Sequence, residues 1–150
     1  MSQINTAQAF SGFLEAAFFT SRGHIDSQSW FSTPREEREM DGSVPSDVDA
    51  EDIHASSLAE LAAIMNEMIV KAKPLLEEAV QCSEYDSEQL GRDLWFTYNG
   101  HGVGFWDREA LCADDLGERI SESIGRGEIH LFYGDHVDLG DAPYVHATTS

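Results

Sequence analysis

Basic residues are scarce in this chain. Nine lysines and arginines stand against 28 acids in 150 residues, which gives a formal net charge of −19. The nine are scattered and form no basic patch, which argues against direct binding of nucleic acid. Electrostatic repulsion also disfavours contact with phosphate backbones and anionic membranes. The favoured partners are basic proteins, including those that themselves bind nucleic acid. The alternative is that the acids only keep the protein in solution.

Cysteine and long apolar runs are scarce as well. Cys82 and Cys112 do not make a disulfide framework, which favours a reducing, intracellular setting. No run approaches the roughly 20 apolar residues of a membrane span. The N-terminal MSQINTAQAF lacks the basic and apolar regions of a signal peptide. The sequence therefore predicts a cytoplasmic protein, and its length favours a single domain over residues 1–150.

Two helices are predicted in the N-terminal half. Residues 6–21 place phenylalanine, leucine and alanine at spacings of three and four, which makes one apolar face. Residues 57–82 begin with the capping box SLAE and carry a heptad-like apolar stripe. A kink is expected near residues 70–73, because Pro74 removes a backbone donor and clashes with the preceding turn. The stripe either packs inside its own domain or pairs two subunits of a homodimer.

Residues 23–52 lie between these helices and are rich in acids, serine and proline. Such a segment lacks the apolar surface that would offset its ordering entropy, so a mobile acidic loop is predicted. Within it, PREEREM is compatible with one or two helical turns, with Pro34 at a first-turn position. Trp30 and Phe31 are expected to pin the start of the loop to the core. The alternative is that they anchor a partner.

The stretch 93–108, DLWFTYNGHGVGFWDR, holds two of the three tryptophans and three of the twelve glycines. Asn-Gly readily takes positive φ at both central positions of a tight turn. Strands at 94–98 and 103–106 are therefore predicted to pair as a hairpin, with successive side chains on opposite faces. This is the strongest hairpin signal in the chain.

The C-terminal part adds one helix and two strands. Residues 111–124 predict a helix, residues 128–133 a strand, and residues 144–147 a further strand after the turn-rich loop 134–141. The predicted fold class is α+β. Two N-terminal helices, one of them long, precede a small antiparallel sheet of three to four strands with one inserted helix, and the helices cover one face of the sheet.

Residues capable of chemistry are few. His101 and Asp107 flank the predicted turn, and an acid–base pair there would indicate a small enzyme, whereas a pair that braces the turn would be structural. No serine or cysteine stands in a nucleophile-elbow context, so no enzymatic activity is predicted. Gly100, Gly102 and Gly104 lack the Lys-Ser/Thr that follows a phosphate-binding loop, so no nucleotide cofactor is predicted.

Metal-binding residue types gather near the C-terminus, where His130, His136 and His146 accompany the aspartates of GDHVDLGD. That stretch lacks the alternating acids and the final glutamate of a calcium loop. No paired Cys or His spacing suggests zinc. A solvated turn is predicted here, with no metal site.

Residues 93–108, together with the preceding SEQLGRD, resemble a recurring, uncharacterised family of small bacteriophage and prophage proteins. The family pattern is close to GHDFW-x-T-R-NGHGAGFWDR, and Arg92 and Tyr98 depart from it where the family has His and Arg. Weaker similarity covers FLEAAFFTS and IHASSLAEL, whereas residues 26–52 look longer and differently composed. The resemblance implies a phage-encoded accessory protein expressed in a bacterial host, and it carries over no catalytic residue. The candidate motif residues are Asp93, Trp95, Asn99, Gly100, His101, Gly102, Gly104, Phe105, Trp106, Asp107 and Arg108.

Many of the acids fall in predicted helices, where a rigid backbone would hold them at regular spacing. Carboxylates spaced in this way imitate the phosphates of a duplex. The favoured function is therefore a phage accessory protein that binds and inhibits or modulates a basic protein, and one form of it is a nucleic-acid mimic directed at a host defence or DNA-processing factor. A small enzyme and a dimeric assembly protein are the alternatives. The candidate acidic surface consists of Glu60, Glu67, Glu77, Glu78, Glu84, Glu88, Asp114, Asp115, Glu118 and Glu122.

Overall fold

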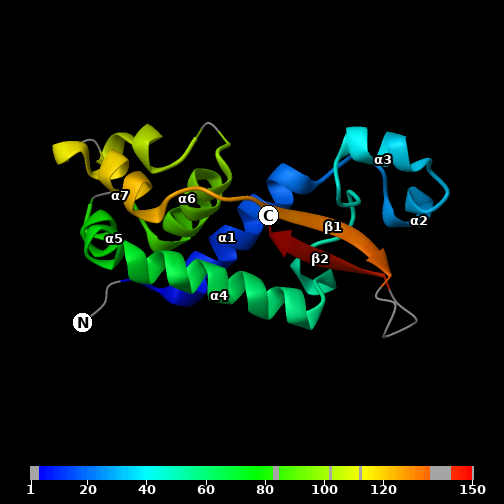
Figure 1. Ribbon diagram of the computed structural model, residues 1–150, viewed down its shortest axis with the longest axis horizontal. Helices are drawn as coiled ribbons and strands as arrows, with labels where there is room; N and C mark the ends of the chain where they lie inside the picture. The colour runs from blue at the N-terminus through cyan, green and yellow to red at the C-terminus, as the bar shows by residue number, and fades with distance from the viewer. Residues whose placement is uncertain (1–3, 83–84, 102, 112, 136–142, 150) are drawn as a thin grey trace. The chain divides into compact units, whose positions relative to one another are not determined.

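The computed structural model describes residues 4–82, 85–101, 103–111, 113–135 and 143–149. Within these ranges it contains seven α-helices, four short 3-10 helices and two strands (Figure 1). The elements are α1 (Thr6–Ser21), α2 (Ser27–Trp30), α3 (Arg35–Asp41), η1 (Ala50–Asp52), α4 (Ala55–Lys71), α5 (Lys73–Val80), α6 (Ser87–Asn99), η2 (Phe105–Asp107), η3 (Glu109–Leu111), η4 (Ala113–Asp115), α7 (Leu116–Ile124), β1 (Ile129–Asp135) and β2 (Pro143–Thr149).

The predicted sheet of three to four strands is wrong. The described part of the chain has one antiparallel sheet of two strands, with Leu131 opposite Ala147 and Tyr133 opposite Val145. Most of the remaining elements are helices, so the fold is α+β only in a loose sense. The missing strands are those of the predicted hairpin within residues 93–108.

That segment is instead the second half of α6, followed by the 3-10 turn η2. Asp86 caps the start of α6 by accepting a hydrogen bond from the Gln89 amide. Gly100 ends the helix in the left-handed conformation, with φ of 67°, and the amide of His101 donates to the carbonyl of Phe96 at 3.1 Å. The Asn-Gly pair is therefore a helix C-terminus and not a hairpin turn.

Other predicted elements are confirmed. α1 covers residues 6–21 as predicted, and the long helix breaks at Ala72, inside the predicted interval, to give α4 and α5. The predicted capping box is wrong, because α4 begins at Ala55. The buried hydroxyl of Ser57 accepts a hydrogen bond from the amide of Ala147 at 3.1 Å, so this serine ties α4 to β2.

The C-terminal predictions hold in part. β1 begins one residue after the start of the predicted strand 128–133, β2 contains the predicted strand 144–147, and α7 begins at Leu116, five residues later than expected. The residues before it form η3 and η4, and Asp114 and Asp115 both have a positive φ of 55°, which interrupts the α-helix. Aspartate tolerates this conformation better than most residues, which explains why the helix starts here.

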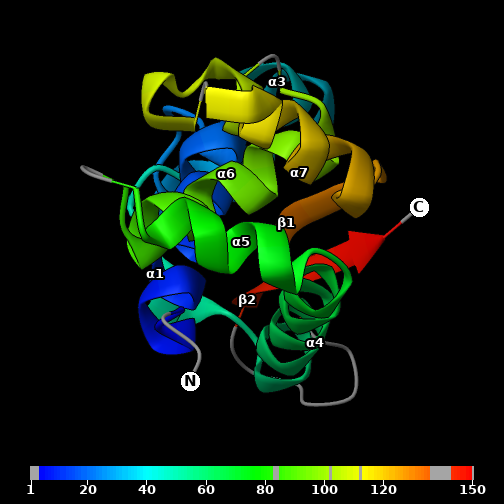
Figure 2. The same ribbon diagram turned by 90° about the vertical axis from the view of Figure 1, so that its left-hand side faces the viewer.

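The chain divides into two compact units, with boundaries inside α1, inside α4 and immediately before β1. Unit 1 comprises Met1–Ala16 and Ala62–Glu128, and unit 2 comprises Ala17–Leu61 and Ile129–Thr149. In unit 1, α5 and α7 lie side by side, as Figure 2 shows. The core of unit 1 includes Phe13, Leu76, Leu90, Trp95, Phe105 and Ile120, and that of unit 2 includes Trp30, Val44, Val48, Leu131 and Val145.

Residues 23–52, predicted to be a mobile acidic loop, contain α2, α3 and η1. The carboxylate of Asp41 at the end of α3 accepts hydrogen bonds from the amides of His24 and Ile25. The amide of Gly23 donates to the carbonyl of Val44 at 2.9 Å. These contacts fold the segment back on itself within unit 2. None of the helices in the described ranges is long and apolar enough to cross a membrane.

Candidate functional site

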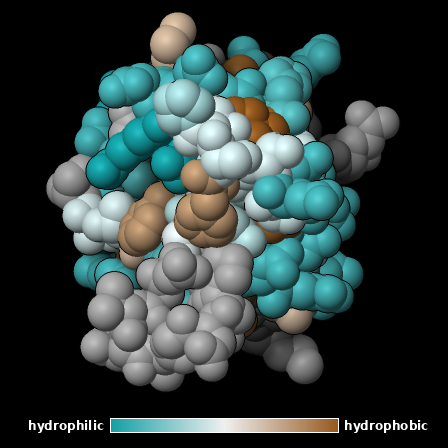
Figure 3. Space-filling model, turned by 90° about the vertical axis from the view of Figure 1, so that its right-hand side faces the viewer, coloured by the Kyte–Doolittle hydropathy of each residue, from teal (hydrophilic) through white to brown (hydrophobic). Residues whose placement is uncertain are grey.

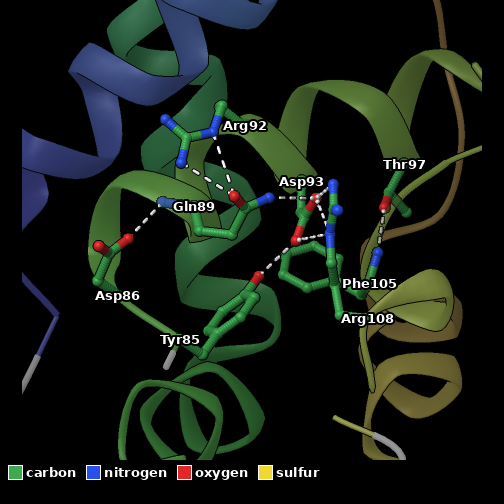
Figure 4. Close-up of polar contacts among 8 residues, drawn as sticks. All are labelled: Tyr85, Asp86, Gln89, Arg92, Asp93, Thr97, Phe105 and Arg108. Carbon is green, nitrogen blue, oxygen red and sulfur yellow. Dashed lines mark hydrogen bonds and ion pairs between the residues drawn. The ribbon is translucent and has the colours of Figure 1, made fainter. Parts of the chain in front are cut away.

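Asp93 is the central residue of the 93–108 motif and is fully buried on α6. Arg108 donates hydrogen bonds to the Asp93 carboxylate from two nitrogens. Nε lies 3.0 and 3.1 Å from the two carboxylate oxygens, and Nη2 lies 2.7 Å from Oδ1. The hydroxyl of Tyr85 donates to Oδ2 at 2.8 Å, and the side-chain Nε2 of Gln89 donates to Oδ1 at 3.1 Å. Figure 4 shows the three side chains converging on this one carboxylate. We call these four residues the Asp93 cluster.

The electrostatics of the Asp93 cluster favour a fixed proton arrangement. Burial, followed by the charge of Asp93 and the hydrogen bond to it, raises the pKa of Tyr85 well above its usual value. The hydrogen bond to Asp93 raises the pKa of Arg108, and this outweighs the opposing effect of burial. Tyr85 therefore stays a neutral donor and Arg108 a cation. Both carboxylate oxygens already accept hydrogen bonds, so the cluster serves to hold α6 against the chain that follows η2.

Helix α6 also lies unusually close to α1. A Cβ placed on Gly91 would lie 1.7 Å from the carbonyl oxygen of Ala9, and one placed on Gly12 would lie 2.0 Å from that of Glu88. Two glycines thus allow the helix backbones to approach each other at the position of the Asp93 cluster. The Trp95 ring, one turn further along α6, packs edge-on against Phe13 at 5.3 Å.

The chain after α6 returns to the same helix. The side-chain oxygen of Thr97 accepts a hydrogen bond from the amide of Phe105 at 3.4 Å, and the Phe105 side chain is fully buried. A Cβ placed on Gly104 would lie 2.3 Å from the side-chain oxygen of Thr97, so the backbone passes close to α6 at this glycine. The side chain of Asn99 donates to the carbonyl of Trp95 at 3.0 Å. Within the motif, Arg108 therefore contacts Asp93 and Asn99 contacts Trp95, and Gly102 lies outside the described residues.

His101 and Asp107 are not brought together as an acid–base pair. Both side chains are exposed, and among the described contacts no hydrogen bond joins them. His101 packs edge-on against Phe96 at 6.3 Å, and partial burial lowers its pKa. No group of three or more His, Cys, Asp or Glu side chains among the described residues is arranged to hold a metal, and His136 lies outside those residues.

The predicted acidic surface is exposed at most of its positions. Glu60, Glu67, Glu78, Asp114, Asp115, Glu118 and Glu122 are exposed, and Glu77 is half-buried. Glu88 differs, because it is half-buried and pairs with Arg92 at 2.8 Å, which also reaches Glu15 at 3.4 Å. Glu84 lies outside the described residues. The helical stripe that could pair two subunits is largely buried, since Leu61, Met65 and Met68 are 3% exposed or less.

Sequence reasoning missed Tyr85 and Gln89 as members of the Asp93 cluster. A helix through residue 93 places Gln89 one turn before Asp93 on the same face, so recognising that helix would have predicted the contact. Tyr85 precedes the cap of α6 and carried no periodic signal. No protein-family model, no curated protein and no solved structure matches this chain.

Proposed function

We propose that this protein is a bacteriophage- or prophage-encoded acidic accessory protein that binds a basic protein of the bacterial host and inhibits or modulates it. The mimic form of the proposal directs it at a defence or DNA-processing factor whose nucleic-acid site the carboxylates occupy. The observation that carries it is the exposure of the helical acids on α5 and α7. The buried motif residues Asp93, Trp95 and Phe105, in contrast, are engaged in packing.

The acids of α7 lie on the solvent side of that helix. Glu118 and Glu122 are one turn apart and exposed, whereas Ile120 and Ile124 are buried on the opposite side. The helix rise places the two glutamates about 6 Å apart along the axis. Glu78 of α5 is also exposed, and α5 packs beside α7 (Figure 2).

These carboxylates are not neutralised within the protein. Glu78, Glu118 and Glu122 form no ion pair with any other described residue. Like charges that are held close on rigid helices raise the local negative potential, and a basic surface relieves it on binding. This supports a partner of positive charge and gives the interaction a strong dependence on salt, because exposed charges are screened over a Debye length.

The test is affinity capture of host proteins at low and at high salt, with two triple variants of equal charge. E78Q/E118Q/E122Q removes three exposed glutamates of α5 and α7, and E36Q/E37Q/E51Q removes three exposed glutamates of unit 2. We expect the wild type and the unit 2 variant to capture the same basic protein at low salt. The α5/α7 variant should bind that protein at least tenfold more weakly, since several charge contacts are lost.

Three results would contradict the proposal. They are capture that is indifferent to salt, equal weakening by both triple variants, and recovery of nucleic acid alone. Competition between duplex DNA and this protein for the captured partner then tests the mimic form, which requires the two to exclude each other.

A further inference from the structure

Unit 2 contains a pocket of about 370 Å³ where α2 and α3 meet β1. Trp30, Arg35, Arg38, Phe132 and Tyr133 line it. Figure 3 looks at the face that carries α2 and α3 and shows apolar residues gathered in the middle of a mostly hydrophilic surface. The volume lies within the range of small-molecule sites. The pocket is separate from the motif and from the helical acids considered above.

The positive charge of unit 2 is concentrated at this pocket. The unit contains thirteen acids and three cationic residues, all of them arginine. Arg35 and Arg38 line the pocket, at a spacing of three that places both on one side of α3. Arg22, the third arginine, hydrogen-bonds the carbonyl of Val48 and is not among the described residues that line the pocket. A pocket with two arginines in such an acidic unit indicates a local preference for an anionic group.

Two hydrogen-bond donors on the pocket-lining residues have no partner in the described part of the chain. Trp30 is 4% exposed, and its indole Nε1 has no hydrogen-bond partner among the described residues. The Nε of Arg38 is also buried and has no hydrogen-bond partner among the described residues. The Arg38 guanidinium carbon lies 5.5 Å from the centre of the Trp30 ring. Buried polar groups without partners are rare in native proteins and costly to maintain. Both atoms are donors only, so their missing partner is an acceptor.

Apart from Gly42 and Ser43, the rest of the lining is aromatic. The Trp30 and Tyr133 rings meet edge to face at 6.0 Å, and Phe132 is 43% exposed. Aromatic walls favour a flat ring, and the arginine forks favour carboxylate or phosphate oxygens. The excess of acids in unit 2 opposes polyanions. These features together select a compact ligand with one flat ring and one anionic group.

We propose that this pocket binds a small ligand in which a planar ring carries one carboxylate or phosphate group. Arg38 and Arg35 hold the anionic oxygens, the Trp30 Nε1–H donates to one of them, and the ring lies against Tyr133 and Phe132. The proposal does not depend on the partner-binding function, because its residues lie outside the acidic surface of α5 and α7.

The test is a titration of the ¹⁵N-labelled full-length protein followed by NMR. The three tryptophans give three indole N–H signals, and a Trp30→Phe variant assigns the one from Trp30. Phenylacetate and adenosine 5′-monophosphate are the ring-bearing anions. Acetate and inorganic phosphate lack the ring, and adenosine lacks the charge. We expect a saturable shift of the Trp30 signal with phenylacetate or the mononucleotide, and a response at least tenfold weaker to the three control compounds.

Arg38→Gln is the informative variant, and Arg119→Gln is its control. Arg119 is exposed on α7 in unit 1, so its substitution changes net charge equally without touching the pocket. Loss of charge-assisted hydrogen bonds should weaken binding roughly tenfold or more in Arg38→Gln. The control should bind as the wild type does. Arg35→Gln provides a second pocket variant if Arg38→Gln alters the backbone spectrum as a whole.

The outcomes are distinguishable. A saturable shift that only phenylacetate produces assigns a carboxylate ligand, and one that only the mononucleotide produces assigns a phosphate ligand. No shift of the Trp30 signal at millimolar concentration of either compound overturns the proposal. Equal binding of acetate or phosphate overturns the role of the ring. Binding that both pocket variants retain in full overturns the role of the arginines.

Discussion

Two arginines in this protein have opposite surroundings. Arg108 in unit 1 gives Nε and Nη2 to a carboxylate that is fully buried. Arg38 in unit 2 has a buried Nε with no hydrogen-bond partner among the described residues and lines an open pocket. The hydrogen bonds of Arg108 to Asp93 contribute to the stability of the fold, whereas the Nε–H of Arg38 is left to bind a ligand. The motif that dominates the sequence therefore belongs to the architecture of unit 1, and the pocket of unit 2 carries no recognisable motif.

The largest effect is expected from Arg108→Met. The substitution keeps much of the side-chain volume but leaves the charge of Asp93 buried without its cation. Breaking one partner of a buried ion pair typically costs about 3 to 5 kcal/mol. We expect a loss of about 3 kcal/mol in the free energy of unfolding by urea, at the lower end because the Arg108 side chain is 31% exposed. An unchanged unfolding midpoint would contradict the structural role of the Asp93 cluster.

Gly91→Ala should follow in size. The added methyl would lie 1.7 Å from the carbonyl oxygen of Ala9, so α1 and α6 must move apart. Overpacking of this kind costs about 1 to 3 kcal/mol, and we expect about 2 kcal/mol. Gly134→Ala in unit 2 is the matched control, because a Cβ there meets no atom within 4 Å. Thermal unfolding followed by circular dichroism measures both, and equal stability of the two variants would refute the close helix approach.

Tyr85→Phe should have a smaller effect at neutral pH and a distinct one in alkali. Loss of the hydrogen bond to Asp93 costs about 1 to 2 kcal/mol at pH 7. The folded-state pKa of Tyr85 lies above the unfolded value of about 10, so the wild type loses stability as pH rises from about 10 through the folded-state pKa. The variant lacks that contribution. The free energy of unfolding of Tyr85→Phe, measured with urea, should therefore fall less steeply above pH 10 than that of the wild type. Parallel pH profiles of the two proteins would contradict this prediction.

Arg38→Met should have the smallest effect on stability. The side chain keeps its packing against Trp30, and the substitution removes a buried donor that has no partner among the residues that the structure describes. We expect a change within about 0.5 kcal/mol in the free energy of unfolding. A loss as large as that of Arg108→Met would show that Arg38 is structural, and it would abolish the contrast between the two units.

Helices were predictable from the sequence wherever the apolar residues fitted the helix period and not the strand period. The phenylalanine face of α1 and the break before Pro74 follow from spacing and backbone chemistry. The predicted strand at residues 94–98 was wrong because the apolar residues of LWFTY fit both the strand period and the helix period. Leu94, Phe96 and Tyr98 alternate as in a strand, whereas Leu90 and Leu94 lie one turn apart on one buried helix face. The contacts of Gly91 with Ala9 and of Asp86 with Gln89 decided for the helix.

The candidate sites were predictable to a different extent. The candidate acids were chosen because they fall mostly in predicted helices, and most of those that the structure describes are exposed. The Asp93 cluster could not be derived, because Tyr85 and Arg108 reach Asp93 only through the path of the chain around α6. The pocket of unit 2 needs α3 to meet β1 across more than 90 residues. No local pattern records such a contact.

The most direct measurement is a double-mutant cycle between Asp93 and Arg108. Urea unfolding of the wild type, Asp93→Asn, Arg108→Met and the double variant gives the coupling energy of the pair. If the 93–108 motif stabilises unit 1 through this ion pair, the double variant loses much less free energy of unfolding than the sum of the losses of the single variants. The expected coupling energy is about 2 kcal/mol or more. Additive losses within about 0.5 kcal/mol would mean that the pair does not hold unit 1 together. The motif would then need another explanation.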